Sequence, residues 1–254
     1  MSTSILVSGA GIAGATAAFW LAQAGYAVTV VERAEGARSS GNPVDVRGAA
    51  VDVAERMGIL ANLRAAATDV RRMTLVDAEG RTVTHIGMGA IPGATAASDV
   101  EIPRADLARI LVDAGRDRVE FIQGDSIREL GQDDSGVDVA FEQASPRRFD
   151  LVVGADGLHS TVRRLAFGPE DRFVRPAGMY VATMPVDPSF AARPDEVLLH
   201  NSPGRLTSVH PAAGKALAAF IFRLRPEHAP HHRDSTGHKR VVGAAYSEAR
   251  WRVP

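Results

Sequence analysis

Residues 4–14 of the chain read SILVSGAGIAG, a short apolar run that leads directly into a glycine-rich turn. The run Ser4–Ser8 predicts a buried parallel strand. The alanine-rich stretch Ile12–Ala24 predicts a helix, because Gly25 follows it at the position where helices commonly end. Val28–Val31 predicts a second buried strand. The first 32 residues are therefore expected to form a compact β-α-β unit.

Three glycines of this turn, Gly9, Gly11 and Gly14, have the spacing G-x-G-x-x-G. Between a strand and a helix, this spacing is typical of a dinucleotide site. The first glycine permits a tight turn, the second leaves room for a pyrophosphate, and the third lets the helix pack closely on the strand. The helix that opens at Ile12 and Ala13 presents free N–H groups and its positive dipole end to the phosphates. We therefore expect these five residues to bind a dinucleotide.

An acidic residue ends the second predicted strand. Glu32 lies 18 residues after Gly14 (32 − 14), near the distance of about 20 residues at which such folds place an acid on the ribose diol. A carboxylate at this position repels a 2′-phosphate, so the sequence favours FAD or NAD over NADP. The alternative is a generic α/β turn beside an incidental surface glutamate. It is disfavoured because strand, glycines, helix, strand and acid all occur in order.

A second strand-turn-helix pattern occurs at residues 149–164, which read FDLVVGADGLHSTVRR. The strand predicted at Leu151–Val153 is followed by a glycine-rich turn that contains Asp156. Ligands of open α/β sheets bind at the carboxyl ends of strands, so Asp156 is placed to accept a hydrogen bond from a hydroxylated chain. Alternatively, Asp156 caps the helix that follows. Ser160 is a further candidate cap of that helix.

The composition excludes several classes of protein. The chain has 254 residues, a net charge of −1 and no cysteine, and its pI is about 6.7. This charge balance provides no field to attract nucleic acid or an anionic membrane. Without cysteine there is no disulfide, thiolate zinc site or cysteine nucleophile. The sequence contains no run of about 20 apolar residues, and its first residues lack a basic signal-peptide region. We expect neither nucleic-acid nor membrane partners, and a cytoplasmic location.

The pattern changes after about Arg175, where short apolar runs are separated by Pro and Gly and predict an antiparallel sheet. Two similar runs occur earlier, on either side of the turn-forming residues Asp77–Gly80. A helix is expected at His238–Trp251. The strands predicted for this part of the chain are Met73–Val76, Thr82–Ile86, Met179–Val186, Glu196–Asn201, Arg205–His210 and Ala216–Leu224.

Together with two further motifs, these patterns resemble the class A flavoprotein monooxygenases, the p-hydroxybenzoate hydroxylase-like family that includes tetracycline-inactivating enzymes. The further motifs are VDVRG, with Arg47 and Gly48, and IPRADL, with Arg104. Their order along the chain is similar to that of the family over about residues 4–175. The resemblance implies an α/β fold, with a Rossmann-like FAD-binding domain of the glutathione-reductase type. It also implies an interleaved antiparallel-sheet substrate domain and an incomplete C-terminus.

The resemblance also implies discontinuous domains. The FAD-binding domain is expected at residues 1–72 and 101–175, the substrate-domain sheet at residues 73–100 and 176–236, and a C-terminal helix at residues 237–254. The family's third motif is a Gly-Asp pair followed by small residues, a Pro and a glycine-rich helix start, and it is not found in this sequence. The sequence therefore resembles the N-terminal two-thirds of such a protein, either as a piece of a longer chain or as a naturally short one.

Individual residues take expected roles from the resemblance. The residues that match Glu32 and Arg33 hold the ribose and adenine side of FAD, and the residue that matches Arg104 lies along the pyrophosphate and ribityl chain. Asp156 matches a residue that contacts FAD, in a motif also associated with NAD(P)H use. Arg47 resembles an arginine near the flavin or the nicotinamide approach. The expected cofactor-binding residues are Gly9, Gly11, Ile12, Ala13, Gly14, Glu32, Arg33, Arg47, Gly48, Arg104, Asp156, Gly157 and Arg163.

For some of these residues, a structural role without any cofactor contact is an alternative. Arg47 can be a solvated loop charge, and Arg104 can simply begin a helix. An arginine at a helix start opposes the helix dipole, which favours an anion close to Arg104. The histidine-rich stretch Glu227–Asp234 lacks the fixed spacing of metal ligands, so it is interpreted as a polar loop and no metal site is expected.

By the resemblance, the full protein reduces FAD with NADH or NADPH and uses O2 to oxygenate a small organic substrate, aromatic or polyketide-like. The substrate is expected between the flavin and the sheet of residues 73–86 and 179–224. The cofactor performs the chemistry, so no catalytic side chain is named. Two alternatives stay open: an FAD-binding protein or fragment without turnover, and a flavin or NAD oxidoreductase that does not hydroxylate. The sequence leaves the oligomeric state open.

Overall fold

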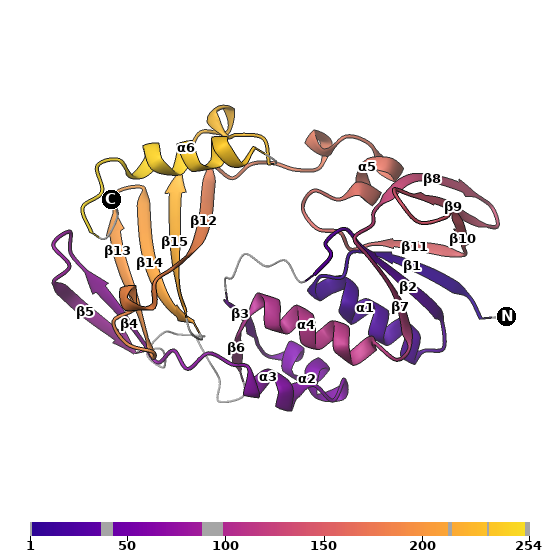
Figure 1. Ribbon diagram of the computed structural model, residues 1–254, viewed down its shortest axis with the longest axis horizontal. Coiled ribbons are helices and arrows are strands. Elements are labelled where there is room, and N and C mark those ends of the chain that lie inside the picture. The colour runs from indigo at the N-terminus through magenta and orange to yellow at the C-terminus, as the bar shows by residue number, and fades with distance from the viewer. Residues whose placement is uncertain (1, 37–42, 88–98, 213–214, 233, 252–254) are drawn as a thin grey trace. The chain divides into compact units, whose positions relative to one another are not determined.

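The computed structural model describes residues 2–36, 43–87, 99–212, 215–232 and 234–251 (Figure 1). Its contacts divide the chain into two units, each built from separate stretches. The Rossmann-like unit comprises Met1–Ser39, Asp52–Ala66 and Ile102–Arg175. The sheet unit comprises Ser40–Val51, Ala67–Glu101 and Pro176–Pro254. The expected FAD-binding domain included residues 40–51 and 67–72. The division by contacts instead assigns these two stretches to the sheet unit.

A four-stranded parallel sheet forms the centre of the Rossmann-like unit, in the order β11-β1-β2-β7. The bounds are β1 Ser4–Ser8, β2 Ala27–Glu32, β7 Val119–Gln123 and β11 Leu151–Gly154. The predicted β-α-β unit is confirmed, with helix α1 at Ile12–Gln23 between β1 and β2. All strand directions agree, so the carboxyl ends of β1, β2 and β11 meet at one edge, where their following turns lie together.

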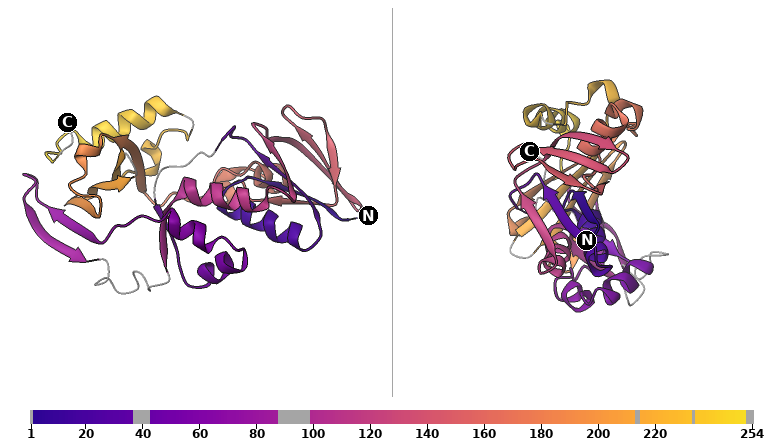
Figure 2. Two further views of the ribbon diagram at one scale, coloured as in Figure 1. Left: turned by 60° about the horizontal axis from the view of Figure 1, so that its bottom comes forward. Right: turned by 90° about the vertical axis from the view of Figure 1, so that its right-hand side faces the viewer.

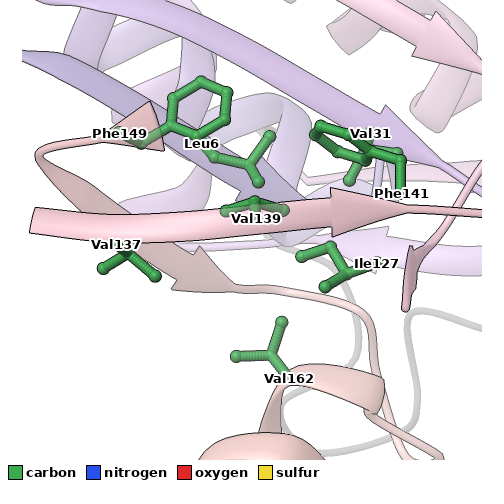
Figure 3. Close-up of a cluster of buried hydrophobic side chains, with 8 residues drawn as sticks. All are labelled: Leu6, Val31, Ile127, Val137, Val139, Phe141, Phe149 and Val162. Carbon is green, nitrogen blue, oxygen red and sulfur yellow. The ribbon is translucent and has the colours of Figure 1, made fainter. Parts of the chain in front are cut away.

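The two faces of the parallel sheet are covered by different layers, because successive side chains along a strand point to opposite faces (Figures 1 and 2). On one face, Val7 and Val30 pack against α1, and α4, which spans Arg104–Gly115, packs against α1. On the other face, Leu6 packs against a three-stranded antiparallel sheet, as Figure 3 shows. That sheet has the bounds β8 Ile127–Asp133, β9 Gly136–Phe141 and β10 Arg147–Phe149.

Shorter elements occur in both units. Helix α5, Thr161–Phe167, follows β11 and contributes Val162 to the cluster in Figure 3. Two short helices are present as well, α2 Ala49–Arg56 and α3 Leu60–Ala65. A two-stranded sheet, which the sequence did not predict, pairs β3 Pro43–Val46 with β6 Val100–Pro103. Single 3₁₀ turns occur at Glu170–Arg172, Pro188–Phe190 and Pro226–His228.

A six-stranded sheet forms the sheet unit, in the order β12-β15-β14-β13-β4-β5. All neighbours are antiparallel except β13 and β4, which pair in parallel, so the expectation of an antiparallel sheet holds for all but this one pair. Parallel neighbours need a long connection between them, and the chain from β4 to β13 provides one. The bounds are β4 Arg72–Val76, β5 Thr82–Gly87, β12 Met179–Val186, β13 Glu196–Ser202, β14 Arg205–Ala212 and β15 Lys215–Arg223.

The last helix differs from its prediction. We predicted a helix at His238–Trp251, but α6 spans Ser235–Tyr246. It begins early because Asp234 accepts a hydrogen bond from the N–H of Gly237 at 2.8 Å and so caps the helix. It ends early because Tyr246 and Trp251 pack into the sheet in different ways: the Tyr246 ring meets the aromatic side chains of β15, while Trp251 joins a separate buried cluster.

Among the helices of the described ranges, none combines the length and apolar character that a membrane crossing requires.

Candidate functional site

A cavity of about 220 Å³ opens at the carboxyl ends of β1, β2 and β11, within the Rossmann-like unit. We call it the glycine-loop cavity. Its lining contains six of the predicted cofactor-binding residues together with polar residues that follow β7 and polar residues near the start of α5. The lining residues are Ser8, Gly9, Gly11, Val31, Glu32, Arg33, Asp125, Ser126, Ala155, Asp156, Gly157, His159 and Thr161.

The glycines of the first turn serve different structural purposes. Gly9 has a φ of +103°, and a Cβ on it would lie 2.6 Å from the carbonyl oxygen of Ala155. A Cβ on Gly14 would lie 1.8 Å from the carbonyl oxygen of Gly9, so only glycine fits where α1 approaches β1. Gly11 is different, because a Cβ there would have no described atom within 4 Å. The backbone needs no glycine at position 11, so the empty space in front of it is available to a ligand.

The carboxylate of Glu32 is fixed at the mouth of this cavity. Its Oε2 accepts a hydrogen bond from the N–H of Ala10 at 2.9 Å, and its Oε1 accepts one from the N–H of Ala34 at 2.8 Å. The acid thus joins the end of β2 to the glycine turn. A carboxylate oxygen can accept more than one hydrogen bond, so Glu32 can still receive the hydroxyls of a ribose.

Asp156 caps helix α5, which confirms the structural alternative that the sequence left open. Its Oδ2 accepts hydrogen bonds from the N–H groups of Thr161 at 2.7 Å and Val162 at 3.0 Å, and its Oδ1 accepts one from the Ser160 hydroxyl. Ser160 is itself a cap, as predicted, because its Oγ accepts from the N–H of Arg163 at 3.0 Å. Asp156 is nevertheless one of the residues that line the glycine-loop cavity.

Asp125 was missed by the sequence analysis, although it lines the cavity and is only 3% exposed. The N–H groups of Ser126, Gln143 and Ala144 donate to its carboxylate at 2.7, 3.0 and 2.8 Å. Burial by itself raises the pKa of a carboxyl, yet these donors hold the pKa of Asp125 below its ordinary value. Its position directly after Gly124, at the carboxyl end of a parallel strand, is the signal that could have identified it.

His159 was missed as well. It is one of the residues that line the cavity, and its Nδ1 lies 3.0 Å from Oε1 of Glu170. The guanidinium of Arg163 donates to the same carboxylate at 3.3 Å and to the carbonyl of Leu158 at 2.6 Å. Arg163 is therefore engaged beside the cavity rather than among its lining residues, where the sequence analysis had expected a cofactor contact.

The remaining predicted residues lie in several places. Ile12 and Ala13 form the first turn of α1, whose N-cap Gly11 makes no side-chain capping hydrogen bond. Arg104 is exposed at the first position of α4, in the Rossmann-like unit but outside the cavity lining. Arg47 and Gly48 belong to the sheet unit, where Arg47 forms an ion pair with Asp45 at 2.5 Å.

Comparison with known proteins identifies the relatives of the chain. A family model described as an FAD binding domain matches residues 2–250. An uncharacterized protein of Mycobacterium tuberculosis is 42% identical over 222 residues, which are 86% of this chain and 59% of that protein. A flavin-dependent monooxygenase from an unknown prokaryotic organism is 33% identical over 250 residues, which are 97% of this chain and 64% of that enzyme.

Among solved structures, the tetracycline destructase Tet(51) matches with a TM-score of 0.86 and 31% identity, over 99% of this chain and 64% of that one. The chain thus spans between 59% and 64% of the length of these proteins. The predicted resemblance to flavin-dependent monooxygenases and the predicted α/β fold are both confirmed. Because the family model covers nearly all of its residues, the chain belongs to the FAD-binding domain family.

Proposed function

We propose that the glycine-loop cavity binds the ADP half of FAD. The observation that carries this proposal is the convergence of two features on one cavity: the open space in front of Gly11 and the fixed carboxylate of Glu32. A pyrophosphate fits the first feature, because no side chain stands before the N-terminus of α1. A ribose diol fits the second, because a carboxylate accepts its hydroxyl protons.

Individual contacts follow from this placement. The N–H groups of Ile12 and Ala13 point from the first turn of α1 and would hold the phosphates. Glu32 would accept the ribose hydroxyls, with Arg33 beside the adenosine. Asp156 would accept a hydroxyl of the chain between phosphate and flavin while it continues to cap α5. The further contacts that we propose on the basis of the family resemblance are Gly9, Gly11, Gly14, Arg47, Gly48, Arg104, Gly157 and Arg163.

For the whole protein we propose a monooxygenase activity on a small organic substrate, aromatic or polyketide-like, with O2 as co-substrate and NADH or NADPH as electron donor. Bound FAD would supply the redox chemistry with O2. The residues of this chain would bind and orient the cofactor and exclude water, with residues 1–72 and 101–175 as the FAD-binding domain and residues 73–100 and 176–236 as the substrate-domain sheet. The similarity to flavin-dependent monooxygenases supports this assignment, and a cytoplasmic location is part of the proposal.

The binding proposal is tested by titration of the purified chain with FAD, followed by flavin fluorescence and by the absorbance spectrum after gel filtration. We expect stoichiometric uptake and a yellow protein. A matched titration with NADP should show much weaker binding, because Glu32 repels a 2′-phosphate. A colourless protein that takes up no FAD would overturn the proposal.

The activity proposal needs a separate measurement, on the gene product at its full natural length. Oxygen-dependent consumption of NADH or NADPH together with a product that has gained one oxygen atom supports a monooxygenase. Consumption without oxygen incorporation indicates a non-hydroxylating oxidoreductase, and FAD binding without consumption indicates a binding protein. These two outcomes contradict the proposed activity and leave FAD binding intact.

A further inference from the structure

The two faces of the six-stranded sheet differ in what packs on them. On one face, Phe220 of β15 meets the ring of Tyr246 in α6, and Val209 of β14 shares a buried cluster with Trp251. Side chains alternate along a strand, so the residues next to Val209 and Phe220 in sequence point to the opposite face. We call this opposite face the His210 face. Its central residues are Leu199 of β13, Ser208 and His210 of β14, and Leu217 and Ala219 of β15.

Apolar side chains surround one polar pair at the centre of the His210 face. In the register of the sheet, Ser208 is paired with Leu199 on one side and with Ala219 on the other. His210 is paired with Leu217. The backbone groups of these strands are engaged in the ladders of the sheet. Ser208 and His210 are therefore the polar groups that the centre of this face presents.

The two polar side chains are hydrogen-bonded to each other. The hydroxyl oxygen of Ser208 lies 2.9 Å from Nε2 of His210. Ser208 is only 3% exposed, and its hydroxyl has no other acceptor among the described residues. A buried hydroxyl that does not donate loses a hydrogen bond, so Ser208 is the donor and Nε2 is the acceptor.

This hydrogen bond determines which nitrogen of the imidazole carries the proton. Burial lowers the pKa of His210 below its ordinary value of about 6.5, so the ring is neutral near pH 7. A neutral imidazole has one N–H group and one acceptor nitrogen. Because Nε2 accepts from Ser208, the proton lies on Nδ1.

The Nδ1–H group of His210 is accessible to a ligand. Nδ1 has no hydrogen-bond partner among the described residues. The fully buried side-chain atoms without a partner in the same ranges belong to Arg72 and Arg163, so Nδ1 retains accessible surface. His210 as a whole is half-buried. The ring thus has one side fixed by Ser208 and one donor directed away from it.

The surroundings of this donor indicate the kind of group that it binds. Burial is the only cause of the shifted pKa of His210, so no charged group of the described residues affects the ring. A carboxylate placed here would lose its water without gaining a cation. A carbonyl oxygen loses much less on leaving water, and one N–H donor satisfies it. The hydrocarbon part of such a molecule would pack on the leucine side chains of the His210 face.

We propose that His210 is a specificity residue for the substrate, and that its Nδ1–H donates a hydrogen bond to a carbonyl oxygen of an uncharged, ring-bearing molecule. Ser208 is a positioning residue, because it acts on the substrate only by fixing the imidazole. The inference rests on the proposed function, since it takes the sheet as the surface that meets the substrate. It narrows the aromatic or polyketide-like class to ketones and related carbonyl compounds.

Nitrogen NMR of the histidine rings tests the state of His210 without any enzyme assay. The chain has eight histidines, and loss of one signal set in His210→Asn assigns that residue. We expect a neutral ring with its proton on Nδ1 near pH 7, and we expect Ser208→Ala to lose this fixed tautomer. A parent ring with its proton on Nε2 would overturn the proposal, because Nδ1 would then be an acceptor.

Two probes test recognition of the carbonyl group. Acetophenone and ethylbenzene share a ring and a two-carbon chain and differ in the carbonyl oxygen. We expect acetophenone to shift the ring nitrogens of His210 in a saturable way. Saturation-transfer NMR gives the affinities of both probes, and the preference for acetophenone should fall about fivefold in His210→Leu. His210→Asn should keep the preference, because its amide N–H occupies the place of Nδ1.

His238→Leu is the matched control, since His238 is exposed on α6, and it should keep the parent's preference for acetophenone. An acetophenone titration that leaves the His210 nitrogens in place overturns the proposal, as does an equal loss of preference in the His210→Leu and His238→Leu chains. If a His210 variant fails to fold, as judged by circular dichroism, the tautomer and the acetophenone titration of the parent still decide the question.

The measurements are made on the chain with and without added FAD, which separates this inference from the proposed function. A chain that takes up no FAD but keeps the preference for the carbonyl compound contradicts the FAD proposal alone. A chain that binds FAD and shows no such preference contradicts the role of His210 alone.

Discussion

The carboxylate of Glu32 accepts a hydrogen bond from the backbone N–H of Ala10 at 2.9 Å, across 22 positions of the chain. This contact joins the residue that ends β2 to the turn that follows β1. The acid therefore has two functions, one in positioning the glycine turn and one in the proposed binding of ribose. Experiments on Glu32 must separate loss of structure from loss of affinity.

Replacement of Glu32 by alanine should weaken FAD binding by about 1–3 kcal/mol, because a charge-assisted contact with the ribose is lost. The affinity is measured by flavin fluorescence titration, and thermal unfolding of the same sample reports the structural part. Glu35→Ala is the control, since Glu35 is exposed three positions later. An unchanged affinity in Glu32→Ala would show that the acid is incidental to binding.

Two glycine variants should separate binding from folding. Gly11→Ala should bind FAD about tenfold or more weakly with little change in thermal stability, because its φ of −69° suits alanine and a Cβ there meets no described atom. Gly14→Ala should instead lower the free energy of unfolding by about 1–3 kcal/mol or prevent folding, since its Cβ collides with the carbonyl of Gly9. If Gly11→Ala bound FAD normally, the pyrophosphate could not lie in front of this turn.

Asp125 should stabilise the folded chain in a pH-dependent way. Its pKa is lowered in the folded state, so its contribution is fully present above the unfolded pKa of about 3.9 and is lost as the pH falls through the folded pKa. We expect Asp125→Asn to be about 1–3 kcal/mol less stable than the parent near neutral pH, because a buried charged acceptor is lost. The difference should shrink below about pH 4.

Urea unfolding at several pH values measures this difference for Asp125→Asn. Asp134→Asn is a suitable control, because Asp134 is exposed in the turn between β8 and β9. A stability difference that stays constant from neutral to acidic pH would mean that the amide and the charged carboxylate differ in packing alone.

Ser160→Ala should lower the free energy of unfolding by about 1 kcal/mol, because the N–H of Arg163 loses its capping oxygen. Ser160→Thr keeps the hydroxyl and should retain most of that stability. Chemical denaturation of the three proteins gives the comparison. The cap idea fails if alanine and threonine behave alike.

The part of the fold that could be predicted from the sequence is the part built from local patterns. Ser4–Ser8 was predicted with the bounds that the structure has, because an apolar run ended by glycine is a strand signal that needs no distant partner. Asp125 also stands in a local pattern, directly after a strand, but its burial could not be predicted, since the N–H groups that hold its carboxylate belong to Gln143 and Ala144, which lie 18 and 19 positions away.

The end of the last helix also could not be predicted from local patterns. The helical pattern continued to Trp251, yet α6 ends at Tyr246 because the two aromatic side chains pack in different clusters. Periodicity reports which side chains could share a helix face, whereas tertiary packing decides which of them do. The Asp234 cap, by contrast, is a local signal that could have moved the predicted start.

The parallel pairing of β4 with β13 has a consequence for how this chain folds during synthesis. Arg72 pairs with Glu196, 124 positions later (196 − 72), and residues 102–175 of the Rossmann-like unit lie between them in the chain. The β4–β5 hairpin therefore leaves the ribosome long before its partner strand exists. Pairings of such long range form slowly, because a large loop must close first. During that interval the apolar side chains of the hairpin are exposed to solvent. A chaperone that shields them should therefore raise the yield of folded protein.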